Sequence, residues 1–364
     1  MASDGRIHNF GAGPAILPME VIKEVANSLP NLHNSGFGLL EISHRSEVFQ
    51  KIIDDARNSV RKVLSIPDSY TVLFLQGGAS LQFYMAPLNI LKEGEMADYL
   101  ITGGWSKKAI KEADRVGDVK AIWNDEVNGF KRVPRDGEYK VRKDAIYLHY
   151  TSNNTLYGTQ YHHLPNSHGK PRIVDASSDI TGVPIDISEH EVVYAGAQKN
   201  LGASGVTLVI LSPWAMSRLG DNTPAMLDYN VHSSKGSMFN TPNTFGIFVL
   251  GRVFAWLERK GGLEGAIKRN IEKSTILYEE LDRTDFWCPH ASEGSRSTMN
   301  ITWRIRDESL EELFLRESLE AGFGGLKGHR SVGGIRASVY NYLPKESIIL
   351  LVDFMKKFES KYNK

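Results

Sequence analysis

One lysine of this sequence stands at the end of a short apolar run and has small residues on both sides. The run is 192–197, Lys199 comes just after it, and Gly202 and Gly205 follow. Glycine lets the backbone approach closely, as an amine requires when it condenses with an aldehyde cofactor. An ordinary lysine in a glycine-rich turn is the commoner explanation for any single residue of this kind. Alone, the stretch is weak evidence for catalysis.

A carboxylate at the end of a second apolar run strengthens that evidence. Residues 172–175 read Arg-Ile-Val-Asp, so Asp175 and Lys199 both stand where a strand is expected to end. A pyridoxal phosphate enzyme needs this pair, because the lysine forms a Schiff base and the aspartate pairs with the pyridinium nitrogen, which lets the ring withdraw electrons. Desolvation beside a cationic ring lowers the lysine pKa from about 10.4. The same amine can then move a proton between substrate and cofactor.

Strands and helices alternate around these two residues. The expected strands are apolar, β-branched runs at 70–75, 97–102, 119–123, 145–151, 172–175, 192–195 and 206–211. Helical periodicity predicts helices from Pro18 to Leu29, from an N-cap at Ser46 to Val63, at 81–91 and at 106–116. Such alternation favours an α/β fold with a mainly parallel sheet covered on both faces. The polar stretch 124–143 is expected to be a surface excursion.

The length of 364 residues allows two domains, because a single core rarely grows beyond about 250–300 residues. Gly261 and Gly262 separate helices expected at 244–259 and 263–281, and we place the boundary there. Beyond it we expect strands at 299–305 and 334–339 and helices at 309–321 and 345–361. The predicted division is an N-terminal arm that packs with the small domain (1–14), a large cofactor-binding domain (15–260) and a small C-terminal domain (261–364).

Charge and cysteine content argue against several classes of function. The 43 basic and 43 acidic residues cancel, and no basic block is present that would hold a nucleic acid. The single cysteine, Cys288, cannot form an intrachain disulfide or a thiolate metal cage, and it fits a reducing compartment. The sequence shows no signal peptide and no membrane-spanning run. We expect a soluble, cytoplasmic protein that needs no metal.

Over nearly its whole length the sequence resembles the phosphoserine aminotransferases, which belong to the class V aminotransferase family. The motifs that carry the resemblance are Gly13-Pro14-Ala15, Ser43-His44-Arg45-Ser46, Gln76-Gly77-Gly78, Gly104-Trp105-Ser106, Gly196-Ala197-Gln198-Lys199-Asn200, Asn240-Thr241-Pro242 and the run 327–338. The last run is long enough to be specific. The resemblance implies pyridoxal 5'-phosphate as cofactor. It also implies the aspartate-aminotransferase-like fold (fold type I), with a large domain around a mainly parallel sheet and a small C-terminal α/β domain.

The resemblance assigns cofactor contacts to several residues. The run 77–80 follows an expected strand and opens a helix, where free N–H groups and the helix dipole favour a phosphate, although a plain tight turn is the alternative. By resemblance Gly78 and Ala79 hold the cofactor phosphate, Trp105 stacks on the pyridine ring, and Thr155 bonds the ring hydroxyl. Without the resemblance, Trp105 would be a rim residue packed on the next helix and Thr155 an ordinary loop residue.

Four further polar residues complete the implied cofactor site. Ser177 resembles a group that steadies the Asp175 carboxylate and Gln198 one that contacts the cofactor phosphate, with ordinary polar packing as the alternative for both. Asn240 and Thr241 look like a helix start. In relatives this segment reaches the phosphate of the neighbouring subunit's cofactor. The resemblance therefore implies an obligatory homodimer with shared active sites.

Basic residues gather in two short motifs of a chain that has no net charge; they are His44, Arg45, His329, Arg330 and Arg336. The planar fork of arginine binds carboxylate and phosphate alike, so a substrate with an α-carboxylate at one end and a phosphate at the other would explain them. Surface ion pairs are the alternative for Arg45 or Arg330 separately. The resemblance assigns the α-carboxylate to Arg336. By resemblance His44, Arg45, His329 and Arg330 bind the distal phosphate or the side-chain carboxylate of glutamate. Some of these contacts are expected to reach across the dimer interface. Relatives often have serine at the position of Ala12, close to bound glutamate.

These features predict a transaminase of serine biosynthesis, which moves the amino group of L-glutamate to 3-phosphohydroxypyruvate by ping-pong kinetics and yields O-phospho-L-serine and 2-oxoglutarate. Three alternatives stay open: another specificity, such as 4-phosphohydroxythreonine or an alanine donor; a lyase or cysteine desulfurase of the same fold; and a non-catalytic binder of phosphorylated metabolites. A desulfurase needs a mobile nucleophilic cysteine. Cys288 stands in the apolar run 286–289, which predicts a buried thiol instead.

Overall fold

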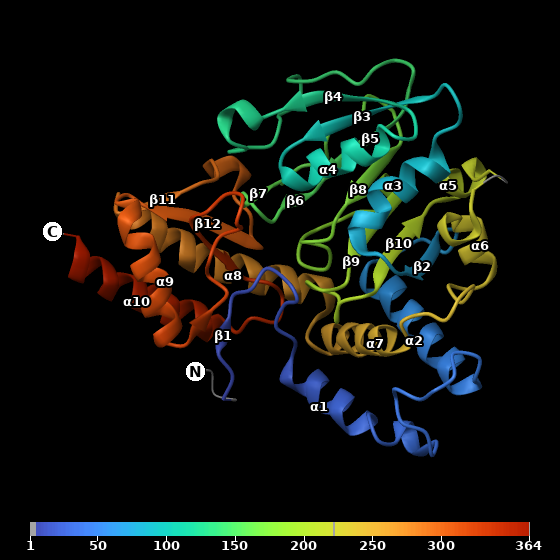
Figure 1. The fold of residues 1–364 in the computed structure, drawn as a ribbon, viewed down its shortest axis with the longest axis horizontal. Coiled ribbons are helices and arrows are strands. Elements are labelled where there is room, and N and C mark those ends of the chain that lie inside the picture. The colour runs from blue at the N-terminus through green and yellow to red at the C-terminus, as the bar shows by residue number, and fades with distance from the viewer. Residues whose placement is uncertain (1–4, 221–222, 364) are drawn as a thin grey trace.

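The computed structural model describes residues 5–220 and 223–363, so residues 1–4 of the predicted arm and Lys364 lie outside the described residues. Its largest element is a seven-stranded sheet in the order β2-β10-β9-β8-β5-β3-β4 (Figure 1). The strands are β2 (Thr71–Leu75), β3 (Met96–Ile101), β4 (Asp118–Asn124), β5 (Ala145–Thr151), β8 (Arg172–Asp175), β9 (Val192–Gly196) and β10 (Thr207–Leu211). Strand β10 pairs antiparallel with β2 and β9, and the other pairs are parallel. The mainly parallel sheet is confirmed.

Helices cover both faces of this sheet. One face packs against α2 (Glu47–Val63) and α7 (Thr244–Arg259). The other packs against α3 (Gly78–Ile90), α4 (Gly104–Ala113), α5 (Pro213–Arg218) and α6 (Tyr229–Ser234). On β9, Val193 and Ala195 enter the first core, whereas Val192 and Tyr194 enter the second. Because both faces are buried, the strands are continuous apolar runs, which is why the sequence reveals them.

Two helices begin earlier than predicted, α3 at Gly78 instead of residue 81 and α4 at Gly104 instead of residue 106. Glycine is a poor helix former, so these first turns resemble loops in the sequence. Gly77 has φ +87, and a Cβ there would lie 2.6 Å from the Leu81 side chain. The turn before α3 therefore requires glycine, and the helix starts directly behind it.

The predicted surface excursion at 124–143 is confirmed in part, because most of its residues are exposed but several of its apolar side chains are buried. Val133, Tyr139 and Val141 are buried in the core beneath α2, and Phe130 is buried in the core on the opposite face. The apolar residues of this stretch are spaced without a helical or strand period, so the sequence gives no signal of their burial.

The C-terminal part of the chain is built on a three-stranded antiparallel sheet in the order β11-β12-β14 (Figure 1). Its strands are β11 (Trp287–Pro289), β12 (Asn300–Ile305) and β14 (Ile335–Ser338), and its helices are α8 (Gly262–Arg283), α9 (Glu311–Glu320) and α10 (Lys345–Tyr362). Strand β1 (His8–Asn9) pairs in parallel with β13 (Phe323–Gly324) and brings the N-terminal segment to this part. The small α/β domain is thus present, with β11 as a strand that we did not predict.

The core of the smaller part also contains Val21 of α1 (Met19–Ser28) and Leu257 of α7, so residues from both sides of the predicted boundary share it. The domain limits stay a prediction. The remaining strands are the pair β6 (Asn153–Asn154) and β7 (Thr159–Gln160). Short 3₁₀ turns lie at Leu32–Asn34, Glu126–Asn128, Ile187–Glu189, Ala225–Leu227, Glu293–Ser295 and Glu308–Leu310. Among the described helices, none has the length and apolarity needed to cross a membrane.

Candidate active site

Four of the expected site residues stand at the carboxyl ends of parallel strands. Asp175 ends β8, Lys199 follows β9, Thr155 follows β5, and Trp105 lies in the first turn of α4 after β3. The carboxyl ends of parallel strands meet at one edge of a sheet, where ligands of open α/β folds bind. A hydrogen bond from Lys199 Nζ to Thr155 Oγ1, 2.8 Å long, joins two of these strand ends directly.

Lys199 is a buried amine, with 8% of its surface exposed. Burial lowers its pKa to about 8, while the carboxylates of Asp175 and Asp179 act upward and the guanidinium of Arg336 acts downward. An amine with this pKa is unprotonated in a substantial fraction of molecules near pH 8. It can therefore act as a nucleophile and as a base, which a solvated lysine does poorly at the same pH.

Asp175 is a buried carboxylate held by Ser177. Its Oδ1 accepts hydrogen bonds from the Ser177 backbone N–H at 3.0 Å and from Ser177 Oγ at 2.6 Å. Ser177 Oγ in turn accepts from the Gly196 N–H at 3.1 Å, which ties β8 to β9. Burial raises the pKa of Asp175, although the Ser177 hydroxyl and Lys199 act in the opposite direction. The expected contact of Ser177 with Asp175 is present.

The first turn of α3 offers backbone N–H groups at the same edge of the sheet. Its N-cap, Gly77, provides no side-chain hydrogen bond to them. Gly78 and Ala79, in this turn, are half-buried. Gln198 is also half-buried, and its backbone oxygen accepts from the Ala15 N–H at 2.8 Å. A helix start of this kind favours an anion such as phosphate.

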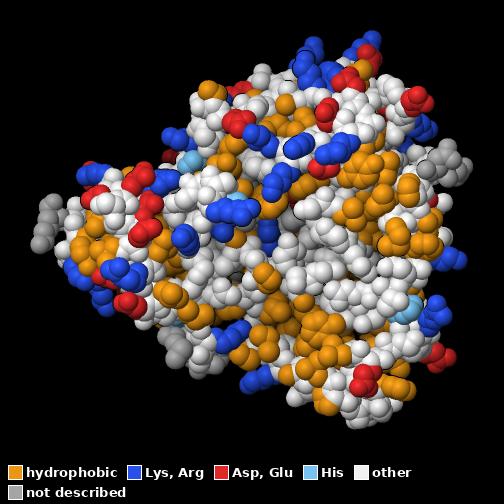
Figure 2. Space-filling view, viewed as in Figure 1, with side chains coloured by type: hydrophobic (Ala, Val, Ile, Leu, Met, Phe, Trp, Pro, Cys, Tyr) orange, Lys and Arg blue, Asp and Glu red, His pale blue; other side chains and the backbone are white. Residues whose placement is uncertain are grey.

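Arg336 reaches the same group from β14. Its Nη1 donates to the Thr155 backbone oxygen at 3.3 Å. His329 and Arg330 lie in the loop before β14, and the pKa of His329 is lowered by burial and by the positive charges of Arg336, Arg330 and Lys108. In Figure 2, Lys and Arg side chains gather in the middle of this face, where the two parts of the molecule meet. Positive charge therefore lies beside the buried lysine.

Comparison with known proteins decides the family. Residues 7–351 match the family described as aminotransferase class-V. The chain belongs to the class V aminotransferase family. It is 47% identical to the phosphoserine aminotransferase of Desulfotalea psychrophila, over 97% of this chain and 98% of that protein. It is 44% identical to the one of Geobacillus kaustophilus, over 98% and 99%.

Solved structures agree with these relatives. The phosphoserine aminotransferase of Bacillus circulans subsp. alkalophilus is 42% identical and superposes with a TM-score of 0.95, over 98% of this chain and 99% of that one. The pyridoxal phosphate-bound enzyme of Trichomonas vaginalis is 34% identical with a TM-score of 0.91, over 96% and 100%. The fold is that of the fold type I aminotransferases.

The residues around Lys199 fit pyridoxal phosphate, the cofactor of this class V aminotransferase. The site offers a buried amine, a buried carboxylate and a helix start for the phosphate. Two more donors, Trp105 Nε1 and Arg336 Nε, are buried without a hydrogen-bond partner within the described part of the chain. Because unpaired buried donors are costly, they favour a site that a polar ligand completes. When bound, the cofactor supplies an aldehyde that condenses with amines and a ring that withdraws electrons.

The structure does not bring every expected residue to this aminotransferase site. His44, Arg45, Asn240 and Thr241 line a separate hollow of about 540 Å³. Among residues 5–220 and 223–363, no hydrogen bond or ion pair connects these four side chains to Lys199, Asp175 or Arg336. Nor do Asn240 and Thr241 start a helix, because α7 begins at Thr244 behind the N-cap Asn243.

One buried residue near the site was missed. Asp179 is 1% exposed and accepts hydrogen bonds from Ser152 Oγ and, at 3.1 Å, from Gln160 Nε2. Burial raises its pKa to about 6, and its charge in turn raises the pKa of Lys199. The signal was a second acid in the polar run 175–181, directly after a strand end.

The prediction of a buried thiol at Cys288 was wrong, because the residue is exposed on β11. Successive side chains of a strand point to opposite faces, so on β11 Trp287 faces the core and Cys288 faces solvent. An apolar sequence environment therefore does not exclude a desulfurase in the way we expected. The argument against that activity comes instead from the full-length relatives, which are named as phosphoserine aminotransferases.

Proposed function

We propose that this chain transfers the amino group of L-glutamate to 3-phosphohydroxypyruvate, giving O-phospho-L-serine and 2-oxoglutarate. The relatives named above carry out phosphoserine transamination by name and span nearly the whole chain. The observation that carries the proposal is the contact of the buried Lys199 amine with Thr155, which Arg336 also contacts. That arrangement places a nucleophilic amine beside a carboxylate-binding guanidinium.

The residues at the strand ends have separate roles in this proposal. Lys199 would hold the cofactor through its amine, and the same amine would take up and return the proton at the substrate Cα. Asp175, held by Ser177, keeps the ring nitrogen protonated because a carboxylate favours a nearby cation. Gly78, Ala79 and Gln198 would hold the phosphate, Trp105 would lie against the ring, and Thr155 would bond the ring hydroxyl.

The substrate side needs a second subunit in this proposal. Arg336 binds the α-carboxylate, and His329 and Arg330, whose charges act on one another and on Arg336, are assigned the distal anion. His44, Arg45, Asn240 and Thr241 share a hollow whose lining does not include this chain's own Lys199, which supports a homodimer in which they complete the partner's site. The cytoplasmic location and the three domain limits remain predictions.

Steady-state kinetics test this function. Initial rates with glutamate and 3-phosphohydroxypyruvate, each varied at several fixed concentrations of the other, should give parallel double-reciprocal lines, because the two half-reactions share one site. Intersecting lines, or a rate with pyruvate that equals the rate with 3-phosphohydroxypyruvate, would contradict the proposal.

A further inference from the structure

Three buried asparagines join the segments that carry Asp175, Lys199 and Arg336. Asn200 directly follows Lys199, Asn341 lies in the segment after β14, and Asn270 lies on α8. Each of these residues is exposed by 3% or less. Burying an amide is costly unless its groups are hydrogen-bonded. The partners of these amides therefore show what the residues hold in place.

Asn341 contacts three segments near the site. Its backbone N–H donates to Asn200 Oδ1 at 3.2 Å. Its side-chain Nδ2 donates to both the backbone oxygen and Oγ1 of Thr181, at 3.0 Å each. Its Oδ1 accepts from Asn270 Nδ2 at 2.7 Å. One residue thus bonds to the segment behind Lys199, the turn behind Asp175 and the long helix α8.

Asn200 closes the connection from the lysine side. Its Nδ2 donates to the Ile180 backbone oxygen at 3.1 Å, in the turn that follows Asp175. Its own backbone oxygen accepts from Tyr342 Oη at 2.6 Å. The segment after Lys199 is therefore bonded at two points to residues 341–342 and at one point to the turn after Asp175.

The turn that Asn341 holds is strained. Thr181 has φ +63, a left-handed conformation that a β-branched residue rarely adopts. Such a conformation persists only where the surrounding structure enforces it. Next to it, a Cβ on Gly182 would lie 3.0 Å from Asn341 Oδ1 and 3.1 Å from Asn270 Nδ2. The turn and the two amides are fitted closely to one another.

Lys273, one turn after Asn270 on α8, fixes the residues just before Asn341. Its Nζ donates to the backbone oxygens of Val339 at 2.8 Å and Tyr340 at 2.6 Å. These two residues connect β14, which carries Arg336, to Asn341. The chain between Arg336 and Asn341 therefore has little freedom, and Lys273 and Asn341 together fix the position of the end of β14.

We propose that Asn341 is a positioning residue that fixes Arg336 relative to Lys199 and Asp175. The inference rests on the proposed function to the extent that Arg336 binds the α-carboxylate of an amino acid. A displacement of about 1 Å at a reacting group can cost about 10²-fold in rate. The amide of Asn341 thus sets how the substrate carboxylate is held beside the amine, without touching substrate or cofactor itself.

The test compares Asn341→Ala with the matched control Asn89→Ala in the protein loaded with pyridoxal phosphate. Asn89 is also a buried amide with three bonds: Nδ2 to the oxygens of Met85 (2.8 Å) and Leu227 (2.7 Å), and Oδ1 from the Tyr229 N–H (3.0 Å). It lies at the end of α3 that is remote from Gly78. Both variants should have a lower Tm, so stability alone does not distinguish them.

The distinguishing readout is the concentration of L-glutamate that half-saturates the absorbance change of the bound cofactor. It should rise about tenfold or more in Asn341→Ala and less than about twofold in Asn89→Ala. The Kd for pyridoxal phosphate should stay close to the wild-type value in both variants, because Asp175 and Lys199 keep their direct contacts. Asn341→Ser, which retains one donor, should fall between wild type and Asn341→Ala, and it decides the question if the alanine variant does not fold.

The proposal would be overturned if the half-saturating concentration of glutamate in the Asn341 variants equalled that of wild type. It would also be overturned if this concentration rose as much in Asn89→Ala as in Asn341→Ala. Glutamate alone is used because it does not depend on the phosphorylated substrate. If wild type responds to glutamate and fails to aminate 3-phosphohydroxypyruvate, the proposed function is wrong, and the positioning role is still decided by the glutamate comparison.

Discussion

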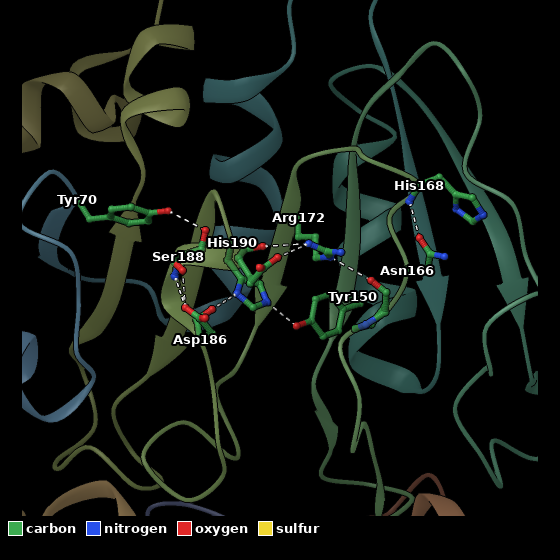
Figure 3. A network of polar contacts seen from close by, with 10 residues as sticks. Tyr70, Tyr150, Asn166, His168, Arg172, Asp186, Ser188 and His190 are labelled. Atoms are coloured by element: carbon green, nitrogen blue, oxygen red, sulfur yellow. Dashed lines mark hydrogen bonds and ion pairs between the residues drawn. The ribbon is translucent and has the colours of Figure 1, made fainter.

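Strand β9 has a buried titratable residue near each end, and the two surroundings differ in how completely their polar groups are paired. His190 precedes the strand, and both its ring nitrogens have partners: Nε2 with Tyr150 Oη at 2.6 Å and Nδ1 with the Asp186 backbone oxygen at 2.8 Å (Figure 3). Lys199 follows the strand, and near it Trp105 Nε1 and Arg336 Nε have no partner in the described residues. Both ring nitrogens of His190 are thus already paired, whereas Trp105 and Arg336 keep donors that a polar ligand can use.

The network around His190 continues into the turn before β9 and borders a cavity of about 480 Å³ that Tyr150, Asp186 and His190 help to line. Tyr70 Oη donates to the Ser188 backbone oxygen at 3.3 Å, and Asp186 Oδ1 accepts from Ser188 N–H and Oγ (Figure 3). Burial lowers the pKa of His190 to about 4, just as it lowers that of Lys199 to about 8. Shifted pKa values thus occur at both ends of the strand. They report burial, and the chemistry depends on what remains unpaired.

The largest expected effect is that of Lys199→Ala. Transamination should fall by at least about 10³-fold, because the amine that holds the cofactor and carries the proton is gone. The cofactor can still bind through phosphate and ring contacts. The measurement is the rate at which glutamate changes the absorbance of the bound cofactor. Substantial turnover with another lysine bonded to the cofactor would refute the assignment.

Asp175→Asn should have the next largest effect. A neutral amide cannot keep the ring nitrogen protonated, so kcat should fall by roughly 10²-fold while the cofactor stays bound. Single-turnover rates with glutamate measure this step. An unchanged rate would mean that Asp175 is structural, like the carboxylate of Asp186 at the other end of β9.

Loss of the distal arginines should affect specificity by a smaller factor. A charge-assisted contact contributes about 1.5–3 kcal/mol, so Arg45→Ala and Arg330→Ala should each lower kcat/KM for phosphoserine by at least about tenfold. The value for serine should barely change. Arg336→Ala is the comparison, since it should weaken both substrates. Equal losses for phosphoserine and serine in the distal variants would assign Arg45 and Arg330 to the fold or the dimer.

The smallest effect on activity is expected for a substitution of His190, which precedes β9. His190→Gln should leave kcat/KM within about twofold of wild type, but change the pH dependence of stability. An unfolded histidine binds a proton below about pH 6.5, whereas folded His190 resists it until about pH 4. Its contribution is thus present above pH 6.5 and is lost as pH falls through this window, by at most about 1.4 kcal/mol per pH unit. Urea unfolding at several pH values measures this effect. The free energy of unfolding should fall less steeply between pH 6.5 and pH 4 in the variant than in wild type. The same slope in both proteins would contradict the burial of a neutral His190.

The sequence identifies the reactive residues better than it identifies the residues that hold them in position. Asp175 and Lys199 end apolar runs that are buried on both faces, so their strands and their shared edge could be predicted. The helix starts at Gly78 and Gly104 could not, because glycine-rich first turns look like loops. Asn341 contacts Thr181 and Asn200 across long stretches of chain, and no local pattern announces such a contact.

A spectrum recorded in two steps tests the central claim most directly. The protein loaded with pyridoxal phosphate is scanned in the visible and near-ultraviolet, then after L-glutamate, and then after 3-phosphohydroxypyruvate. The account predicts that glutamate changes the cofactor absorbance and that the phosphorylated keto acid restores it, while Lys199→Ala shows neither change at a comparable rate. A wild-type spectrum that glutamate leaves unchanged, or a Lys199→Ala variant that completes the cycle like wild type, would contradict it.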